Sequence, residues 1–373
     1  MAIPPTLQLE SQIFLILTPG LIISHPFART FHFLIIENHQ VSLYGLYMLI
    51  ARLTKKKNQF DRAGDMPADL ARNLHEWFRV ELTYTSNALE GNTLTRRETA
   101  MVVEKGITVG GKTMVEHLEA TNHAQAFDWI DEKSQKSLKY FTEDDLLSLH
   151  KMILSGIDNH NAGFYRNVPV RLSGSRTVLP NPRKVPYLMS GFYKWLQSKK
   201  DIHPVDLAAE AHFRLVTIHP FIDGNGRTAR LLMNFILMCH GYPPAIIRKS
   251  ERGKYLDALE KAQTGGSGVD YQQLIYRAVD RSLDIYLEAM VGDGDFVAEP
   301  DDSFLRIGQL AKQTDVNVST IRFWLTSGLL EVSETTASGY QLFSTSMVLR
   351  VEQIKTLKEQ RFTIQEIKSK LAV

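Results

Sequence analysis

The chain has 373 residues, which is long enough for two or three domains, and its apolar and charged fractions are ordinary for a globular protein. A formal net charge of +2 excludes a general, charge-driven affinity of the whole chain for polyanions. The single cysteine, Cys239, excludes an intramolecular disulfide framework and fits a reducing, cytoplasmic environment.

Residues 1–59 form an amino-terminal arm in our division of the chain. Its apolar runs, Ile13–Leu17 and Leu21–Ile23, are separated by Pro19, and each is far shorter than the roughly 20 residues that span a bilayer. The first basic residue is Arg29, so the basic start of a secretory signal is missing. We expect a buried or poorly ordered arm and no membrane partner; a membrane anchor is the alternative.

Helical periodicity dominates residues 60–290. From Ala68 to Tyr84, for example, apolar residues recur at helical spacing on one face. We divide this region into amino-terminal helices over 60–135 and a helical core over 136–290, and we therefore expect an all-α fold.

Within the first set of helices, Ser86 and Glu90 stand four residues apart in a predicted helix over 83–92, so they share a helix face. Gly91 follows and can end that helix. Taken alone, this pattern is common and describes a surface Ser/Glu pair at a helix end.

Residues 168–186 interrupt the helical pattern. They contain β-branched residues and the turn signal Ser173-Gly174-Ser175, with Pro180 as a breaker. We predict a short β-hairpin here, and Pro169 restricts it to an exposed edge because proline cannot donate to a strand ladder.

The segment His219–Arg230 combines the groups that a triphosphate–metal site needs. Pro220 stops the preceding helix, so His219 lies at an element end where its ring can face a cleft. The tight loop Asp223–Gly226 leads directly into a helix whose first backbone amides form an anion site. The carboxylate of Asp223 suits Mg²⁺, which takes oxygen ligands and bridges phosphates.

Arg227 and Arg230 are three residues apart and project from neighbouring positions on the first turn of that helix. A lone histidine beside proline is usually structural, a Gly-Asn-Gly loop is usually a turn, and paired arginines are usually a solvated face. Their occurrence together in one short segment favours the functional interpretation.

His219–Arg230 matches the signature H-P-F-x-[D/E]-G-N-G-R-x-x-R at every specified position, so the chain resembles the Fic family. The resemblance covers about residues 60–290. It implies an all-α Fic fold with a β-hairpin flap, and a protein adenylyltransferase. Such an enzyme transfers AMP from ATP, with Mg²⁺, to a Ser, Thr or Tyr hydroxyl of a target protein or of itself. Retention of Gly226 favours AMP transfer over phosphate transfer.

The resemblance also implies residue roles. His219 is the catalytic base, Asp223 binds Mg²⁺, and Glu90, with Ser86 beside it, is inhibitory because Glu90 pairs with Arg230 and takes the cation meant for the γ-phosphate. Tyr255 and Gln263 fall where the family contacts adenosine, although Leu256 replaces a second tyrosine there. The remaining ATP-binding residues are Gly224, Asn225, Gly226, Arg227 and Arg230 around the phosphates, and Ser175, Arg176 and Thr177 in the flap.

An acidic, Gly/Pro-containing stretch over 291–302 is a linker candidate, and a small domain follows over 303–373. Ile307–Ala311, Thr320–Arg322 and Gly339-Tyr340 resemble the winged helix-turn-helix of MerR-type regulators. This resemblance implies DNA binding, with base contacts from Ser319, Thr320 and Arg322 early on the recognition helix and phosphate contacts from Arg306, Lys312, Arg322 and Arg350. A protein-interaction winged helix is the alternative.

Two further functions stay open. One is hydrolytic removal of AMP from a modified protein, with Glu90 orienting water. The other is a DNA-binding regulator whose Fic core senses nucleotide. A homodimer also stays open.

Overall fold

In this computed structural model, the residues whose structure is described are 28–198, 202–291, 304–332, 334–335, 341–344 and 346–371. The predicted linker over 291–302 lies, apart from Val291, outside the described residues, and so do the apolar runs of the predicted arm.

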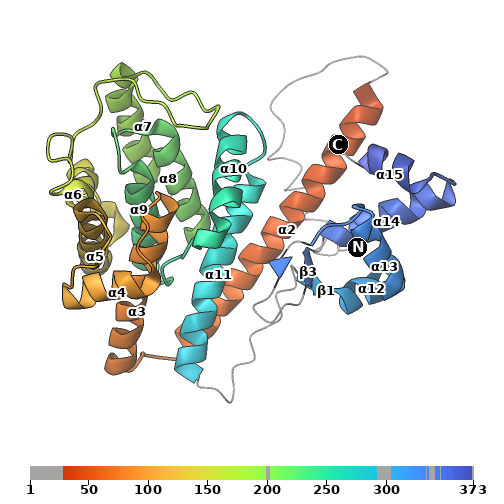
Figure 1. Cartoon of the computed structure of the whole chain (residues 1–373), viewed down its shortest axis with the longest axis horizontal. Helices are drawn as coiled ribbons and strands as arrows, with labels where there is room; N and C mark the ends of the chain where they lie inside the picture. The colour runs from red at the N-terminus through yellow and green to blue at the C-terminus, as the bar shows by residue number, and fades with distance from the viewer. Residues whose placement is uncertain are drawn as a thin grey trace, which may run out of the picture. The chain divides into compact units, whose positions relative to one another are not determined.

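The described residues from 60 to 290 are mainly helical, as predicted. The two central helices, α8 and α9, pack against each other (Figure 1), with α5 and α6 against α9, α7 and α11 against α8, and α3 against α5. Their bounds are α2 Ala28–Arg62, α3 Ala68–Leu89, α4 Arg96–Lys105, α5 Met114–Ser134, α6 Glu143–Leu154, α7 Val185–Ser198, α8 Pro204–Ile218, α9 Asn225–Cys239, α10 Arg252–Gln263 and α11 Val269–Val291, with 3-10 turns at Leu138–Tyr140, Pro182–Lys184 and Lys249–Glu251.

Local sequence signals set the ends of the helices that carry the site. α8 begins with Pro204 at its first position, after His203, whose side chain accepts a hydrogen bond from the amide of Val205. It ends at His219, where Pro220 follows. α9 begins after Gly224, which has a left-handed φ of 74°. Glycine adopts that conformation without steric cost, so a sharp turn joins the two central helices.

The prediction of a β-hairpin over 168–186 is wrong. None of the described residues in that range forms a strand, and the turn is closed by the amide of Ser175 donating to the carbonyl of Leu172 at 3.2 Å. Pro169 and Pro180 lack the amide donors that a ladder needs, so an extended loop with a turn forms instead. We keep the name flap for residues 168–180.

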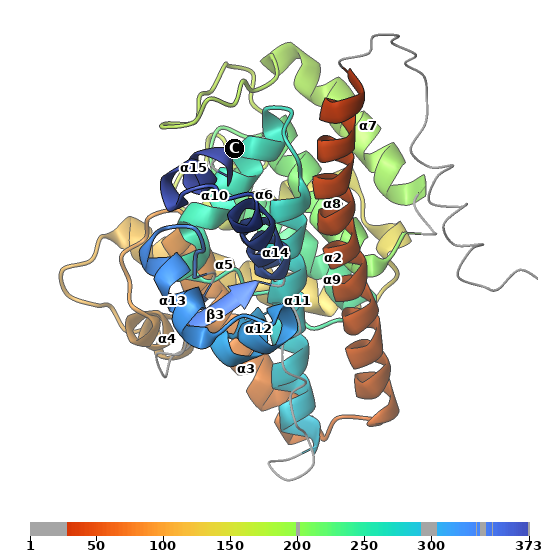
Figure 2. The same cartoon turned by 90° about the vertical axis from the view of Figure 1, so that its right-hand side faces the viewer.

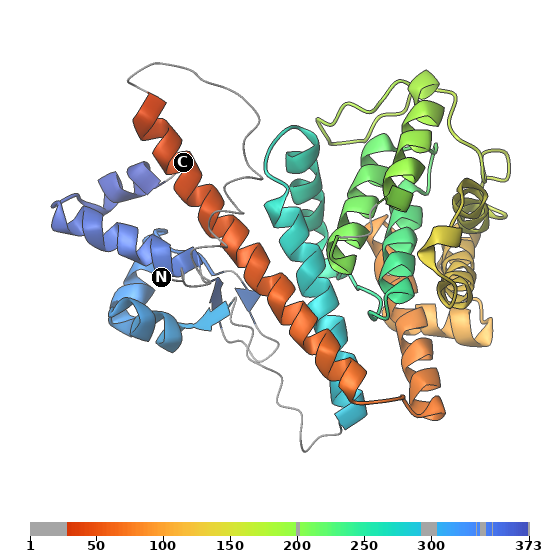
Figure 3. The same ribbon diagram turned by 180° about the vertical axis from the view of Figure 1, so that it is seen from behind.

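The predicted arm does not end at residue 59, because α2 runs through that position to Arg62. From residue 45 onward, α2 contributes Leu49 and Leu53 to the helical core. Lys56 of the same stretch pairs with Asp280 of α11 at 2.6 Å, and Figures 1 and 3 show this later part of α2 beside α11. None of the described helices has the length and apolar character to cross a bilayer.

The carboxy-terminal residues form a second hydrophobic core of their own. It includes Leu310, Trp324, Phe343, Ile354 and Ile367. The three-stranded antiparallel sheet has the order β1-β3-β2, and α12 and α14 contact β3 (Figure 2). The bounds are β1 Phe304–Arg306, α12 Ile307–Thr314, α13 Val318–Thr326, β2 Glu334–Thr335, β3 Gln341–Ser344, α14 Ser346–Glu359 and α15 Ile364–Leu371. The predicted order of two helices, a strand and two more helices is confirmed, while Gly339 and Tyr340 lie outside the described residues.

Candidate active site

His219 is the carboxy-terminal cap of α8 and has a left-handed backbone with φ 52°. Its Nδ1 lies 3.3 Å from the carbonyl of Val216. Because a carbonyl only accepts, the neutral ring carries its proton on Nδ1 and leaves Nε2 free as a base. Burial lowers the pKa of His219 below its ordinary value, so the ring is neutral near pH 7.

Two side chains hold the loop that follows His219. Asn225 accepts from the amide of Phe221 and donates to its carbonyl, both at 2.9 Å. His150 lies stacked on Phe221 with ring centroids 3.6 Å apart. Its Nδ1 accepts from the amide of Gly163 at 2.9 Å, so its Nε2 donates to the carbonyl of Asp223 at 3.0 Å. Burial lowers the pKa of His150 to about 4, which keeps it in this neutral tautomer.

The anion site predicted at the start of α9 is made of backbone. The first hydrogen bond within the helix runs from the amide of Thr228 to the carbonyl of Gly224, so the amides of residues 225–227 precede it. The expected phosphate contact of Asn225 is therefore limited to its amide, because its side chain is engaged with Phe221. The side chain of Asp223 is 64% exposed beside these amides.

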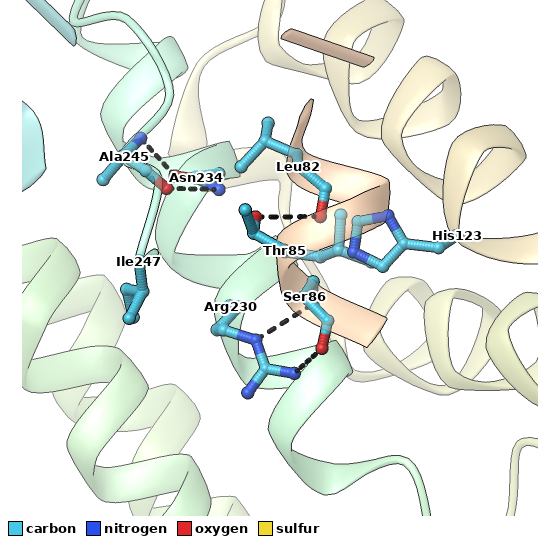
Figure 4. A pocket seen from close by; sticks show the side chains of 9 residues that line it. Leu82, Thr85, Ser86, His123, Arg230, Asn234, Ala245 and Ile247 are labelled. Carbon is cyan, nitrogen blue, oxygen red and sulfur yellow. Dashed lines mark hydrogen bonds between the residues drawn. The ribbon is translucent and has the colours of Figure 1, made fainter. Parts of the chain in front are cut away.

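Both arginines of the motif are paired with the amino-terminal helices. Arg227 Nη1 donates to Glu119 Oε1 of α5 at 2.7 Å. Arg230 Nε donates to Ser86 Oγ at 2.9 Å, and its Nη2 donates to the Ser86 carbonyl at 2.9 Å and to Glu90 Oε1 at 2.6 Å. Figure 4 shows Arg230 directed at Ser86, in a cavity that is also lined by Thr85, His123 and Asn234.

Glu90 caps the end of α3 and keeps 38% of its side chain exposed. Although burial opposes ionisation, the charge of Arg230 holds the pKa of Glu90 below its ordinary value, so it is a carboxylate. Ser86 is buried, so the alternative of a surface pair does not describe this contact. A Cβ atom at Gly226 would lie 2.2 Å from Glu90 Oε1, and only glycine leaves room for the carboxylate here.

The flap is attached to α10. Arg176 Nε donates to Glu260 Oε1 at 3.0 Å. Thr177 Oγ1 donates to Gln263 Oε1 at 3.1 Å, and Gln263 Nε2 donates to Thr217 of α8 at 3.2 Å. The hydroxyl of Ser175 accepts from the amide of Thr177 at 3.1 Å. The predicted nucleotide-contacting residues of the flap and Gln263 thus lie together at one edge of the site.

The prediction for Tyr255 needs correction. Its side chain is 2% exposed, and its hydroxyl bonds His212 Nε2 at 2.9 Å, while Tyr271 bonds the other ring nitrogen at 2.8 Å. Tyr255 belongs to the core and offers no surface to adenosine, because apolar packing and His212 use both its ring and its hydroxyl. Its neighbour Leu256 is the exposed residue.

In the carboxy-terminal domain, Ser319 and Arg322 are exposed and Thr320 is half-buried on the first turns of α13. The expected phosphate contact of Arg350 is wrong. Its guanidinium donates to the carbonyls of Leu329 and Leu371 at 3.2 and 2.7 Å, which joins elements within the domain.

Sequence reasoning missed three residues of the site: His150, Glu119 and Arg166, which bonds the carbonyl of His219. All three lie on elements remote in sequence from the motif. A carbonyl partner leaves no trace in the sequence, so only Glu119 carried a detectable signal, as an acidic residue on a predicted helix.

The comparisons agree with this geometry. Residues 140–237 match the Fic/DOC family, and residues 305–372 match the MerR HTH family regulatory protein model. A protein adenylyltransferase Fic from Culex quinquefasciatus is 38% identical over 240 residues, which are 64% of this chain and 47% of that protein. The chain spans about half the length of the curated relatives it matches.

Two solved structures are also similar. A Fic domain-containing signaling protein from Bacteroides thetaiotaomicron has a TM-score of 0.60 and 27% identity, covering 66% of this chain and 99% of that one. Fic-1 from C. elegans has a TM-score of 0.61 and 28% identity, covering 68% and 76%. The chain therefore contains a segment similar to the Fic/DOC family over residues 140–237 and, on its carboxy-terminal side, a segment similar to MerR-type helix-turn-helix regulators over residues 305–372.

Proposed function

We propose that the Fic domain transfers AMP from ATP to a hydroxyl side chain of a protein, and that Glu90 restrains this activity. The observation that carries the proposal is the arrangement of one free imidazole nitrogen, three helix-start amides and two arginines around a single loop. Phosphoryl-type transfer depends mainly on such positioning and on charge stabilisation. The named relatives are protein adenylyltransferases.

The chemistry assigns one role to each group. Nε2 of His219 takes the proton of the target hydroxyl, whose oxygen attacks the α-phosphorus of ATP. The bond from the α-phosphorus to the bridging oxygen breaks, and pyrophosphate leaves. The amides at the start of α9 and the guanidinium groups of Arg227 and Arg230 stabilise the phosphate charge.

Asp223 is the residue that would hold Mg²⁺. Its carboxylate is exposed beside the phosphate site, and Mg²⁺ needs only one or two protein carboxylates when phosphates complete its shell. Within the described ranges no group of three or more His, Cys, Asp or Glu gathers into a metal site, which fits an ion held jointly with phosphates. The bound ion would offset the charge of the phosphates.

Restraint by Glu90 follows from competition for one cation. A guanidinium clasps either a carboxylate or a phosphate, and Glu90 occupies Arg230 at 2.6 Å. With Glu90 in place, the γ-phosphate lacks its partner and meets a carboxylate, so the α-phosphate is misaligned for attack.

The test is self-labelling of the full chain by ATP labelled at the α- or the γ-phosphate. We expect Glu90→Gly to incorporate label from α-labelled ATP only, and Glu90→Gly/His219→Ala to incorporate none. Incorporation of the γ-label would show that the protein transfers phosphate and not AMP. Absence of both labels from the protein and from supplied target proteins would refute transfer.

Removal of AMP from a modified protein is the second candidate. It is favoured by the exposed part of the Glu90 carboxylate, which can orient a water molecule near His219. Wild-type chain incubated with premodified Glu90→Gly chain would release AMP under this alternative. We further propose that Ser319, Thr320 and Arg322 contact DNA, a role that the MerR-type match supports.

A further inference from the structure

Arg166 joins the catalytic loop to the flap, and we infer that it is a positioning residue for both. The inference deepens the proposed function and rests on it: Arg166 touches no reacting atom, but it holds the backbone of the base and both ends of the segment that borders the nucleotide site.

The contacts of Arg166 reach three separate pieces of backbone. Nε donates to the carbonyl of His219 at 2.7 Å. Nη1 donates to the carbonyl of Val168 at 3.2 Å, and Nη2 donates to the carbonyl of Pro180 at 2.7 Å. The backbone amide of Arg166 adds a bond to the carbonyl of Pro220 at 2.8 Å. One side chain therefore connects the end of α8 with the first and last residues of the flap.

These carbonyls need such a partner. The carbonyl of His219 lies beyond the last turn of α8, where no amide of that helix donates to it. Val168 and Pro180 belong to a loop that forms no strand pairs. The left-handed backbone of His219 is strained and persists only where the surroundings hold it. The Arg166 guanidinium supplies that restraint.

Arginine is the residue type that this arrangement requires. The guanidinium presents several N–H groups in a rigid plane, whereas an ammonium on a flexible stem does not reach several fixed acceptors at once. Arg166 is 3% exposed, and among the described residues no carboxylate lies within ion-pair distance of it. Its charge faces carbonyl dipoles, and replacement by lysine keeps that charge but loses the planar set of N–H donors.

The test compares Arg166→Lys with Arg183→Lys, an exposed arginine just past the flap, both in the Glu90→Gly chain. We expect Arg166→Lys to slow self-labelling by about 10²-fold, because a displacement of about 1 Å can cost that much. The dissociation constant for Mg·ATP should change much less than the rate. Hydrogen exchange of the amides over 168–180 should become faster. The Arg183→Lys control should match its parent in all three measurements.

Labelling by Arg166→Lys at the rate of the control, or slower labelling with unchanged exchange of the flap, would overturn the inference. Should the Glu90→Gly parent label neither itself nor supplied target proteins, AMP transfer is wrong, and hydrogen exchange of the flap alone then tests the role of Arg166. If Arg166→Lys does not fold, Arg166→Gln, which keeps an amide donor, takes its place in the same measurements.

Discussion

Replacement of Glu90 by glycine should raise activity and lower stability together, because Arg230 loses its carboxylate in the absence of nucleotide. Arg230 is buried, and removing one member of a fully buried pair costs about 3–5 kcal/mol. Glu90 is 38% exposed, and two bonds to Ser86 remain. We therefore expect a loss of about 1–2 kcal/mol, and a fall in melting temperature of roughly 2–8 °C.

Bound ATP should recover the stability that Glu90→Gly loses, because the γ-phosphate of ATP offers Arg230 a new partner. The assay is a thermal melt of wild type, Glu90→Gln and Glu90→Gly, each with and without Mg·ATP, beside self-labelling rates. Stabilisation by ligand grows with its concentration relative to the dissociation constant, so Mg·ATP should raise the melting temperature most in Glu90→Gly. Glu90→Gln keeps the shape and removes the charge, and should fall between the two. Equal ligand-induced shifts and equal labelling in all three proteins would refute competition for Arg230.

Two further substitutions and one pH profile test neighbouring residues of the site. Gly226→Ala places a methyl group 2.2 Å from Glu90 Oε1 and 2.9 Å from Arg230 Nη1, so it should destabilise the wild type by about 1–3 kcal/mol and the Glu90→Gly chain by less; equal melting shifts in both backgrounds would contradict this contact. Glu119→Gln should tighten Mg·ATP binding measured by calorimetry, because Arg227 then keeps only its longer contact with Asp223 at 3.4 Å, whereas the exposed Glu104→Gln should not. Burial lowers the pKa of His219 against the opposing charges of Glu90 and Asp223, with Arg166 acting in the same direction as burial. The base works when neutral, so the acidic limb of labelling against pH in Glu90→Gly should lie below pH 6.5, and a limb above it would exclude His219 as the base.

The parts of the site that are contiguous in sequence were predictable from it. Pro220, Gly224 and the spacing of Arg227 and Arg230 act within one turn of chain, so their local effects on the backbone follow from residue type alone. The winged-helix order was implied by the resemblance of three short segments to MerR-type regulators.

Contacts between segments that are remote in sequence could not be predicted from local residue types. His150 and Arg166 bind carbonyls, which every residue possesses, so no pairing of side-chain types reveals them. Tyr255 was misjudged because burial depends on where α10 packs, and its partner His212 lies on another helix. The flap was misjudged because a turn signal between β-branched residues outweighed the missing donors of its prolines.

The hydrogen bonds made by the residues of His219–Arg230 fall into two kinds. Under the proposed function, only one kind competes with the phosphates of a nucleotide. Bonds to backbone from within the core hold the loop, and they leave the helix-start amides and the Nε2 atom of His219 free. Bonds from α3 and α5 instead occupy the guanidinium groups that the proposed function assigns to phosphates. The Glu119 carboxylate that holds Arg227 also accepts from Asn92 at 2.8 Å, two residues beyond Glu90. Under the proposed function, nucleotide binding therefore exchanges carboxylates for phosphates on the side chains of Arg227 and Arg230, without remodelling of the catalytic loop.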